Sequence, residues 1–217
     1  MVTNDDRVKE IVRAINELDV QETTDQVDRM SDSFYYFWIQ ISDKDIPVEL
    51  DEDTIPINNE RYQDPLTKLY NRRGFFEKTG ALIKKYQINH LYVVMCDIDH
   101  FKKINDTWGH AIGDRILCEI GQILKDSVRD EDLIARFGGE EFVIMVKCSN
   151  YASTIKLVNR IRNRIEKQSF TENCIDVTVS FGIAEIQSHT ELTEALELAD
   201  QRLYAAKNNG RNQVCFH

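Results

Sequence analysis

The chain lacks several features that would place it at once in a class of protein. No apolar run approaches the roughly 18–20 residues that a membrane helix needs, and the first residues do not have the basic and then apolar pattern of a signal peptide. The five cysteines are scattered, with no Cys-x-x-Cys pair, so we expect reduced thiols and no disulfide framework. A P-loop pattern is also missing. These absences predict a cytoplasmic protein that binds no membrane.

Negative charge is concentrated in the first part of the chain, and the net charge is −10. Residues 1–62 carry 16 acidic and 6 basic side chains, whereas residues 63–217 carry 21 of each. This asymmetry indicates two units with different roles, and the acidic unit argues against nucleic-acid binding because it repels phosphate. Residues 1–62 also contain neither cysteine nor histidine, which argues against haem or thiolate–zinc sensing there.

Residues 1–42 are predicted to form an N-terminal helical segment with two apolar stripes. The second stripe consists of Val27, Met30, Phe34, Phe37, Trp38 and Ile41. Three arrangements remain open: the helices fold against each other, they pack on the rest of the chain, or they join two chains as a four-helix bundle or coiled coil. Residues 43–62, with Pro47 and Pro56, have the composition of an acidic linker.

The remaining residues, 63–217, alternate between helical and strand patterns. A helix is expected over residues 65–86, with Asp64 as its N-cap. The further elements, in order, are a strand at 91–96, helices over 101–127 with a break near Gly109 and Gly113, a hairpin of 133–137 and 142–146, a helix at 151–168, a strand at 175–183, a helix at 190–209 and a strand at 214–216. This order favours a ferredoxin-like α+β sheet with helices on one face.

Acidic side chains follow the first strand and lie at the tip of the hairpin. Asp97 and Asp99 are two residues apart, so they point to the same side of a strand. The tip reads Gly138-Gly139-Glu140-Glu141, a tight turn that places two more carboxylates nearby if the strands are neighbours. Mg²⁺ prefers oxygen ligands and commonly bridges carboxylates to substrate phosphates. Taken singly, each group is explained as well by a solvated strand end or an ordinary Gly-Gly turn.

The segment between them has residues suited to a purine nucleotide. A helix that starts near Phe101 offers unpaired N–H groups to phosphate. Asp114 can accept from the N1–H and N2–H₂ groups of guanine, and Asn105 can donate to its O6 or N7. An adenine edge presents an acceptor at N1, so Asp114 would disfavour it. Alone, each of these residues is more simply a surface polar group or a helix cap.

Together these segments resemble the GGDEF family of diguanylate cyclases. The resemblance rests on DIDHFKKIND at 97–106, GHAIGD at 109–114 and RFGGEEF at 136–142, and it extends to an opening DPLTKLYNRR at 64–73 and a closing ADQRLYAAK…GRN at 199–212. It covers about residues 62–217, and Lys68 departs from a usual glycine. The resemblance implies an antiparallel nucleotidyl-cyclase-palm sheet surrounded by helices. It also implies an enzyme that condenses two GTP into cyclic di-GMP and two pyrophosphates.

The family motifs, carried over residue by residue, imply roles for this chain's own side chains. Mg²⁺, with Mn²⁺ as the alternative, would be held by Asp97, the carbonyl of Ile98 and Glu140, with Glu141 as the base and Lys102 as a phosphate-binding catalytic group. The residues implied to bind substrate are Asn105, His110, Asp114, His100, Phe101, Lys207 and Arg211. Arg129 and Asp132 match an Arg-x-x-Asp site for inhibitory product, and Arg160 is a weaker contact to product from a partner domain.

Cyclisation requires two such domains to face each other, so the resemblance implies a homodimer, and residues 4–42 are the candidate dimeriser. Two rival readings remain. One is a catalytically idle GGDEF module that binds GTP or cyclic di-GMP as a regulatory adaptor. The other is a nucleotidyl cyclase or polymerase palm of another kind, which the guanine-reading residues and the Gly-Gly-Glu-Glu hairpin fit poorly.

Overall fold

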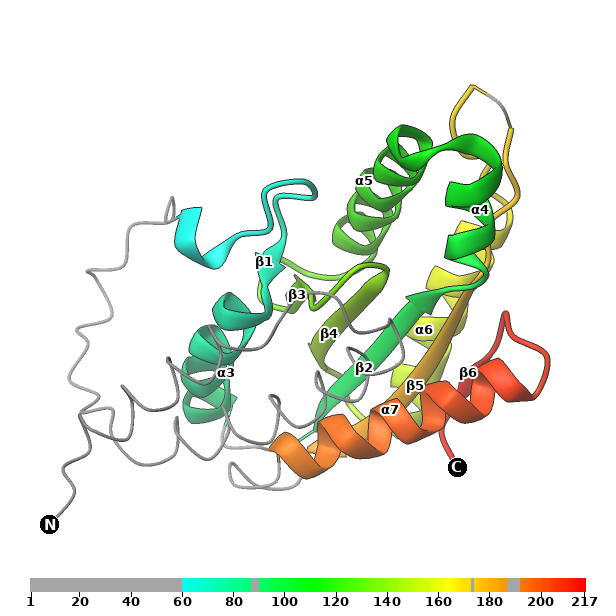
Figure 1. Ribbon diagram of the computed structural model, residues 1–217. Helices are drawn as coiled ribbons and strands as arrows, with labels where there is room; N and C mark the ends of the chain where they lie inside the picture. Colours follow the sequence, from blue (N-terminus) through cyan, green and yellow to red (C-terminus); the bar gives the residue numbers. More distant parts are fainter. Residues whose placement is uncertain (1–59, 87–89, 173, 187–191) are drawn as a thin grey trace, which may run out of the picture. The chain divides into compact units, whose positions relative to one another are not determined.

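A six-stranded mixed sheet forms the centre of the computed structural model, which describes residues 60–86, 90–172, 174–186 and 192–217 (Figure 1). The strand order is β1-β3-β4-β2-β5-β6. The strands are β1 (Tyr70–Asn71), β2 (Leu91–Ile98), β3 (Leu133–Arg136), β4 (Glu141–Lys147), β5 (Val179–Ile186) and β6 (Val214–Cys215). The helices are η1 (Glu60–Tyr62), α3 (Arg72–Tyr86), α4 (Phe101–Trp108), α5 (His110–Ser127), α6 (Tyr151–Glu166) and α7 (Leu192–Asn208).

The four central strands are antiparallel, as the predicted palm-like sheet requires. β4 pairs with both β3 and β2, and β2 pairs with β5. The two short edge strands, β1 and β6, pair in parallel with β3 and β5. The α+β class and the palm-like sheet are therefore confirmed, with two parallel edges that the sequence pattern did not reveal.

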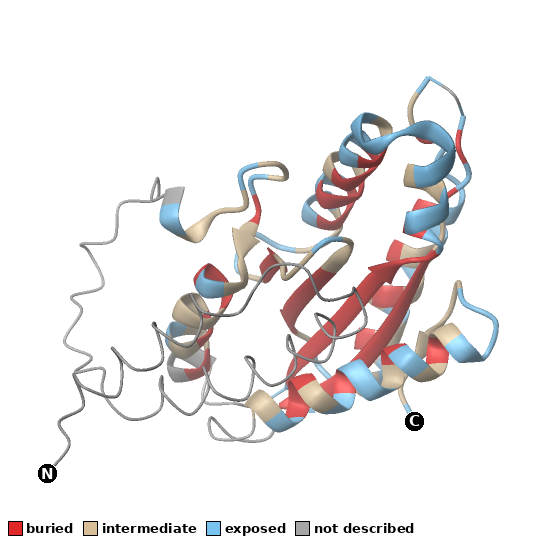
Figure 2. Ribbon diagram, in the orientation of Figure 1, coloured by how far each residue is buried: buried red, intermediate tan, exposed pale blue. Residues whose placement is uncertain are grey.

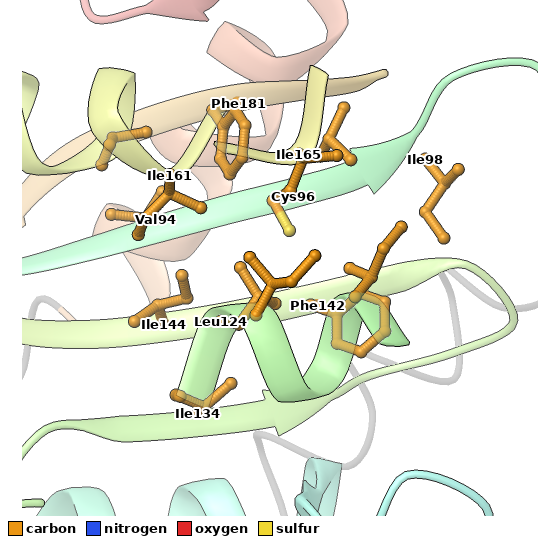
Figure 3. Packing of buried hydrophobic residues seen from close by; sticks show 14 of the residues in the cluster. Val94, Cys96, Ile98, Leu124, Ile134, Phe142, Ile144, Ile161, Ile165 and Phe181 are labelled. Atoms are coloured by element: carbon orange, nitrogen blue, oxygen red, sulfur yellow. The ribbon is translucent and has the colours of Figure 1, made fainter. Parts of the chain in front are cut away.

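Helices cover both faces of this sheet, so the element order was wrong in favouring one covered face, whereas the family resemblance was right. On one face α5 and α6 pack on Val94, Cys96 and Ile144 (Figure 3). On the other face α3 and α7 pack on Val93, Met95 and neighbouring side chains. All eight residues of β2 are buried (Figure 2). Its unbroken apolar run, rather than an alternating one, is typical of a strand that is covered on both sides.

The helix predicted from Pro65 is wrong in its start, because α3 begins only at Arg72. Asp64 does cap a turn, since its Oδ1 accepts bonds of 2.7 Å from both the N–H and the hydroxyl of Thr67. The chain then joins the sheet as β1. The true cap of α3 is Asn71, whose Oδ1 accepts from the N–H of Gly74 at 2.9 Å. Pairing with β3 therefore overrides a local helix signal.

The predicted break between α4 and α5 falls at Gly109, where φ is +83°. Gly113 lies inside α5 and serves packing instead, because a Cβ there would be 1.9 Å from Oδ1 of Asn105. β5 begins at Val179, later than predicted, and Ile175 pairs back with Phe170 as an isolated bridge. The predicted N-terminal helices and most of the linker lie outside the described residues.

Among the helices that the structure describes, none combines the length and the apolar character needed to cross a membrane.

Candidate active site

The acidic strand end and the acidic hairpin tip lie side by side. Asp97 and Glu141 are register partners in the β2–β4 ladder, and the N–H of Ile98 donates to the carbonyl of Glu140 at 3.4 Å. The end of α7 adds a cation, because Nζ of Lys207 lies 2.8 Å from Oδ2 of Asp97. The sheet thus brings together Asp97, Ile98, Glu140 and Glu141, as the sequence predicted, and adds a direct Lys207 contact that it did not.

Burial makes this cluster electrostatically strained. Burial raises the pKa of Asp97 above its ordinary value, and the hydrogen bond and charge of Lys207 only partly oppose this effect. The pKa values of Glu140 and Glu141 are also raised, first by burial and then by repulsion from Asp97. The charge of Lys207 acts on all three carboxylates, and a further positive charge would relieve their repulsion.

The donor set fits a hard divalent cation that is completed by substrate. Within residues 60–86, 90–172, 174–186 and 192–217, no three His, Cys, Asp or Glu side chains converge closely enough to form a metal site by themselves. Two carboxylates, of Asp97 and Glu140, together with a strand-end carbonyl still leave coordination positions for phosphate oxygens and water. Mg²⁺ sites that act on nucleotides have this partial protein ligand set.

Asp99 has a different role from Asp97, although the sequence placed the two acids together. Its carboxylate accepts from the hydroxyls of Thr178 (2.8 Å) and Ser180 (2.7 Å) and from the N–H of Asn212 (3.0 Å). These three donors satisfy a buried carboxylate. Asp99 therefore anchors the segment before β6 to the end of β2, and its charge also raises the pKa of Asp97.

The two residues expected to read guanine lie at the junction of α4 and α5. Oδ1 of Asn105 is buried against Gly113 and has no hydrogen-bond partner. Asp114, the next residue along α5, is exposed, as is His110 in the first turn of that helix. A buried amide oxygen without a hydrogen-bond partner lowers stability. The junction of α4 and α5 therefore has an amide oxygen without a hydrogen-bond partner beside the exposed carboxylate of Asp114.

The residues expected to bind phosphate surround the start of α4. His100 adopts the left-handed conformation with φ of 57° and positions the first turn, while Phe101 is buried and Lys102 is exposed. Arg211 is exposed and also has a positive φ, of 64°. Its segment is anchored by the bond from Asn212 to Asp99. In the described parts of the chain, the side chains of Lys102 and Arg211 form no ion pair, whereas Lys207 is bound to Asp97.

A link between Asp64 and Arg136 was not predicted. Nη1 of Arg136 lies 3.2 Å from both carboxylate oxygens of Asp64, and its Nε and Nη2 donate to the carbonyl of Gly139 at 3.1 and 2.7 Å. One side chain thus ties the hairpin tip to the turn before β1. Both residues belong to segments that carry the resemblance, but no spacing rule connects positions 72 residues apart.

The three residues expected to bind inhibitory product lie at the opposite end of the sheet. Arg129, Asp132 and Arg160 line one cavity of about 680 Å³ within a single chain. Asp132 accepts from the N–H groups of Arg129 (2.9 Å) and Lys147 (3.3 Å), and Nη2 of Arg160 donates to the carbonyl of Ser127 (3.0 Å). Arg160, expected as a weaker contact to product from a partner domain, lines the same cavity as Arg129 in this chain.

Comparison with known proteins identifies the family of the chain. The family model described as "Diguanylate cyclase, GGDEF domain" matches residues 61–213. The chain is similar to diguanylate cyclase DosC of Escherichia coli K12, with 40% identity over 161 residues, which cover 70% of this chain and 34% of that protein. It is also similar to diguanylate cyclase A of Treponema denticola, with 37% identity over 175 residues, which cover 74% of this chain and 47% of that protein.

Among solved structures, the GGDEF domain of DgcB from Caulobacter crescentus, in complex with c-di-GMP, has a TM-score of 0.67 and 28% identity and covers 74% of this chain and 98% of that chain. The active GGEEF domain of a diguanylate cyclase from Vibrio cholerae has a TM-score of 0.62 and 31% identity, over 67% and 96% of the two chains. The chain spans about a third to a half of the length of the curated relatives named above. On the match over residues 61–213, together with these relatives, the chain belongs to the GGDEF domain family of diguanylate cyclases.

Proposed function

We propose that this protein is a diguanylate cyclase that condenses two GTP molecules into cyclic di-GMP and releases two pyrophosphates. The observation that carries the proposal is that the sheet register places Asp97, Glu140 and Glu141 next to one another at one strand end, with burial and mutual repulsion raising their pKa values. Such a cluster suits a cation-assisted phosphoryl transfer, in which catalysis consists mainly of positioning and charge neutralisation.

Each residue then has a defined task. Asp97, the carbonyl of Ile98 and Glu140 hold Mg²⁺, or Mn²⁺ in its place, which supplies positive charge to the triphosphate. Glu141 accepts the proton of a ribose 3′-hydroxyl, whose oxygen bonds to the α-phosphorus of the other nucleotide while the bond to pyrophosphate breaks. The raised pKa of Glu141 suits a base that operates near neutral pH. Lys102, Lys207, Arg211 and the N–H groups after His100 hold the phosphates.

Guanine selectivity is assigned to the α4–α5 junction. Asn105 and Asp114 contact the base edge, with His110 nearby. The unpartnered Oδ1 of Asn105 supports this assignment, because rotation of the side-chain amide would present its N–H₂ group as a donor to the base. The relatives' names and the solved DgcB domain in complex with c-di-GMP support guanine nucleotides as substrate and product.

The active species is proposed to be a homodimer that is formed through residues 1–42, with residues 43–62 as an acidic linker to a catalytic domain of residues 63–217. Each buried large apolar side chain contributes roughly 1.5–3 kcal/mol, so the row from Val27 to Ile41 can offset the entropy of association. We expect truncation to residues 60–217, or the double change Phe34→Asp and Phe37→Asp, to give monomers whose turnover per chain rises with protein concentration. A double variant that stays dimeric would contradict this role.

Product inhibition is proposed to act through Arg129 and Asp132, with Arg160 as an additional contact. The support is that all three line one cavity, which suits an anionic, guanine-bearing ligand. We also propose a cytoplasmic location, where GTP is available, and binding to neither nucleic acid nor membrane.

The alternative is an idle module that binds GTP or cyclic di-GMP without turnover. Incubation of the full chain with GTP and Mg²⁺, beside its Glu140→Gln variant, separates the two. We expect cyclic di-GMP from the parent and none from the variant. Nucleotide binding without product in both proteins would favour the adaptor and refute the cyclase.

A further inference from the structure

A second polar cavity lies on the α3 side of the hairpin tip, and none of the three clustered carboxylates lines it. Its volume is about 390 Å³. It is lined by Asp64, Asn71, Arg72, Arg73, Arg136, Phe137, Gly138 and Gly139. Three arginines against one aspartate leave a surplus of two positive charges among the lining residues. The cavity is therefore suited to an anion.

Two of the arginines occupy positions that helix stability disfavours. Arg72 and Arg73 are the first two residues of α3, and the first turn of that helix has no acidic residue. The N-terminus of a helix carries partial positive charge, so cations there destabilise it and acidic side chains are preferred. A local rule broken in this way is expected where function requires it. Both the partial positive charge of the helix end and the charge of the guanidinium groups would attract an anion in the cavity.

Aromatic faces hold these two guanidinium groups in place. Cζ of Arg72 lies 5.6 Å from the ring centroid of Phe137, and Cζ of Arg73 lies 5.8 Å from that of Tyr62. A guanidinium that is positioned over a ring keeps its donors in the plane of a rigid fork, the geometry that matches phosphate oxygens. Arg136 donates to Asp64 and Gly139, so it forms a wall of the cavity.

The hairpin leaves one side of the cavity open. Gly139 is exposed, and a Cβ built on it would meet no atom within 4 Å. The paired glycines therefore place backbone, rather than side chains, between this cavity and the outside, so a large ligand group can approach closely.

The cavity lies across the hairpin from the phosphate-binding residues described above. In the sheet, β1 and β3 stand on one side of β4, and β2, which carries Asp97 and its Lys207 contact, stands on the other (Figure 1). Glu141 lies between the two, and the charge of Arg72 acts on it. An anion bound here would be next to the base but separate from the phosphates of the nucleotide held by Lys207 and Arg211.

We propose that Arg72 and Arg73 form a phosphate-binding subsite and that it takes the phosphate of the second nucleotide, the GTP presented by the facing domain. This assignment of the ligand rests on the proposed cyclase function, whereas the subsite itself does not. A free phosphate or pyrophosphate has the same chemistry, so the experiment has one arm for anion binding and one for turnover.

In the first arm, pyrophosphate without divalent cation is titrated calorimetrically into the full chain. The double variant Arg72→Gln, Arg73→Gln is compared with Lys125→Gln, Lys167→Gln, which removes the same charge from exposed positions outside the cavity. Arg211→Gln removes a cation from the other phosphate site. We expect the Arg72 and Arg73 variant to lose one class of binding site by at least about tenfold in affinity, and Arg211→Gln to retain that class. Binding equal to that of the lysine control overturns the subsite.

In the second arm, cyclic di-GMP synthesis is measured at saturating GTP. The double arginine variant is expected to lose at least about tenfold in kcat, while binding of a non-hydrolysable GTP analogue to a single domain is almost unchanged. Lost pyrophosphate binding with normal kcat would overturn the assignment to the second nucleotide. Because the titration involves no turnover, an inactive parent would refute the proposed function without affecting the first arm.

Discussion

The carboxylate cluster at one end of the central strands and the cavity at the other end carry opposite charge. At one end Asp97, Glu140 and Glu141 outnumber Lys207, a surplus of two negative charges. At the other end the cavity around Asp132 is lined by Arg129, Lys147, Lys156 and Arg160, a surplus of three positive charges with histidine neutral. The carboxylate cluster of Asp97, Glu140 and Glu141 is suited to binding a cation, and the cavity around Asp132 is suited to binding an anionic ligand. The sheet thus separates the proposed active site from the proposed site for inhibitory product.

Register fixes the distance between the two ends. Asp97 pairs with Glu141, and Leu91 pairs with Lys147, six residues earlier in β2. Six residues of strand span roughly 20 Å. A ligand at the basic end therefore cannot touch a nucleotide at the acidic end. The proposed product inhibition would therefore act through the arrangement of domains or through the strands themselves, which are buried and closely packed.

The largest expected effect separates the two aspartates at the end of β2. Asp97→Asn should lower cyclic di-GMP synthesis by roughly 10²–10³-fold or more, because it removes a cation ligand. Asp99→Asn should instead destabilise the fold by about 1–3 kcal/mol, because the amide nitrogen that replaces one carboxylate oxygen cannot accept, so either the bond from Ser180 or the bonds from Thr178 and Asn212 are lost. Turnover at saturating GTP and thermal unfolding are measured for both. Equal effects of the two changes on both quantities would show that the distinction is wrong.

The next largest expected effect concerns the side chain of Arg136, which links the hairpin tip to Asp64. Arg136→Gln should lower kcat by about 10²-fold, because the carbonyl of Gly139 loses its anchor and small misplacements of reacting groups are costly. Asp64→Asn, which leaves the bonds to Gly139 in place, should have a smaller effect. Steady-state kinetics with GTP check the order. A larger loss for Asp64→Asn would mean that the turn before β1, rather than the hairpin, is what the ion pair serves.

The dependence of stability on pH tests whether repulsion and burial destabilise the carboxylate cluster of Asp97, Glu140 and Glu141. The folded-state pKa of Glu140 is raised above its ordinary value of 4.5, so the folded state holds that proton more tightly than the unfolded state. The contribution of Glu140 to the free energy of unfolding therefore falls as pH rises from about that value through the raised pKa. Glu140→Gln should stabilise the protein at neutral pH and lose this advantage at acidic pH. Thermal unfolding at several pH values, with exposed Glu172→Gln as control, measures the difference, and a constant difference would refute the strain.

The smallest expected effect on initial rate is at the basic end. Arg129→Ala should leave the initial rate unchanged and raise the concentration of cyclic di-GMP needed for inhibition, because Arg129 lines only the distant cavity. Exposed Lys125→Ala serves as the control. Inhibition constants are measured with added product. If inhibition persists unchanged in the Arg129 variant, the cavity does not bind the inhibitory product.

Local patterns predicted the elements of the sheet well and its edges poorly. The apolar run of β2 and the Gly138-Gly139 turn were sufficient for the central strands, because burial and turn chemistry act over a few residues. Asp64 followed by Pro65 gave a false helix start, since the pairing of β1 with β3 is a long-range effect. The order of elements alone also failed to show that α3 and α7 cover the second face.

The candidate site follows the same division. Asp97 and Glu141 could be placed near each other only on the assumption that β2 and β4 are neighbours, and the roles of Lys207 and Arg211 came from the family resemblance. No spacing indicated that Lys207 reaches Asp97, or that Arg136 spans from Gly139 to Asp64. Arg72 and Arg73 stood within the opening motif without a role. The role proposed for Arg72 and Arg73 depends on a cavity that forms only in the folded chain.

The most direct test of the account is the product that forms when the full chain is given α-labelled GTP with Mg²⁺. Nucleotides are separated by chromatography and pyrophosphate is quantified, with Asp97→Asn and a chelator as controls. The account predicts cyclic di-GMP and pyrophosphate in a ratio of one to two from the parent, and neither from the controls. GTP that is bound but recovered intact, or GDP as the only product, would contradict it.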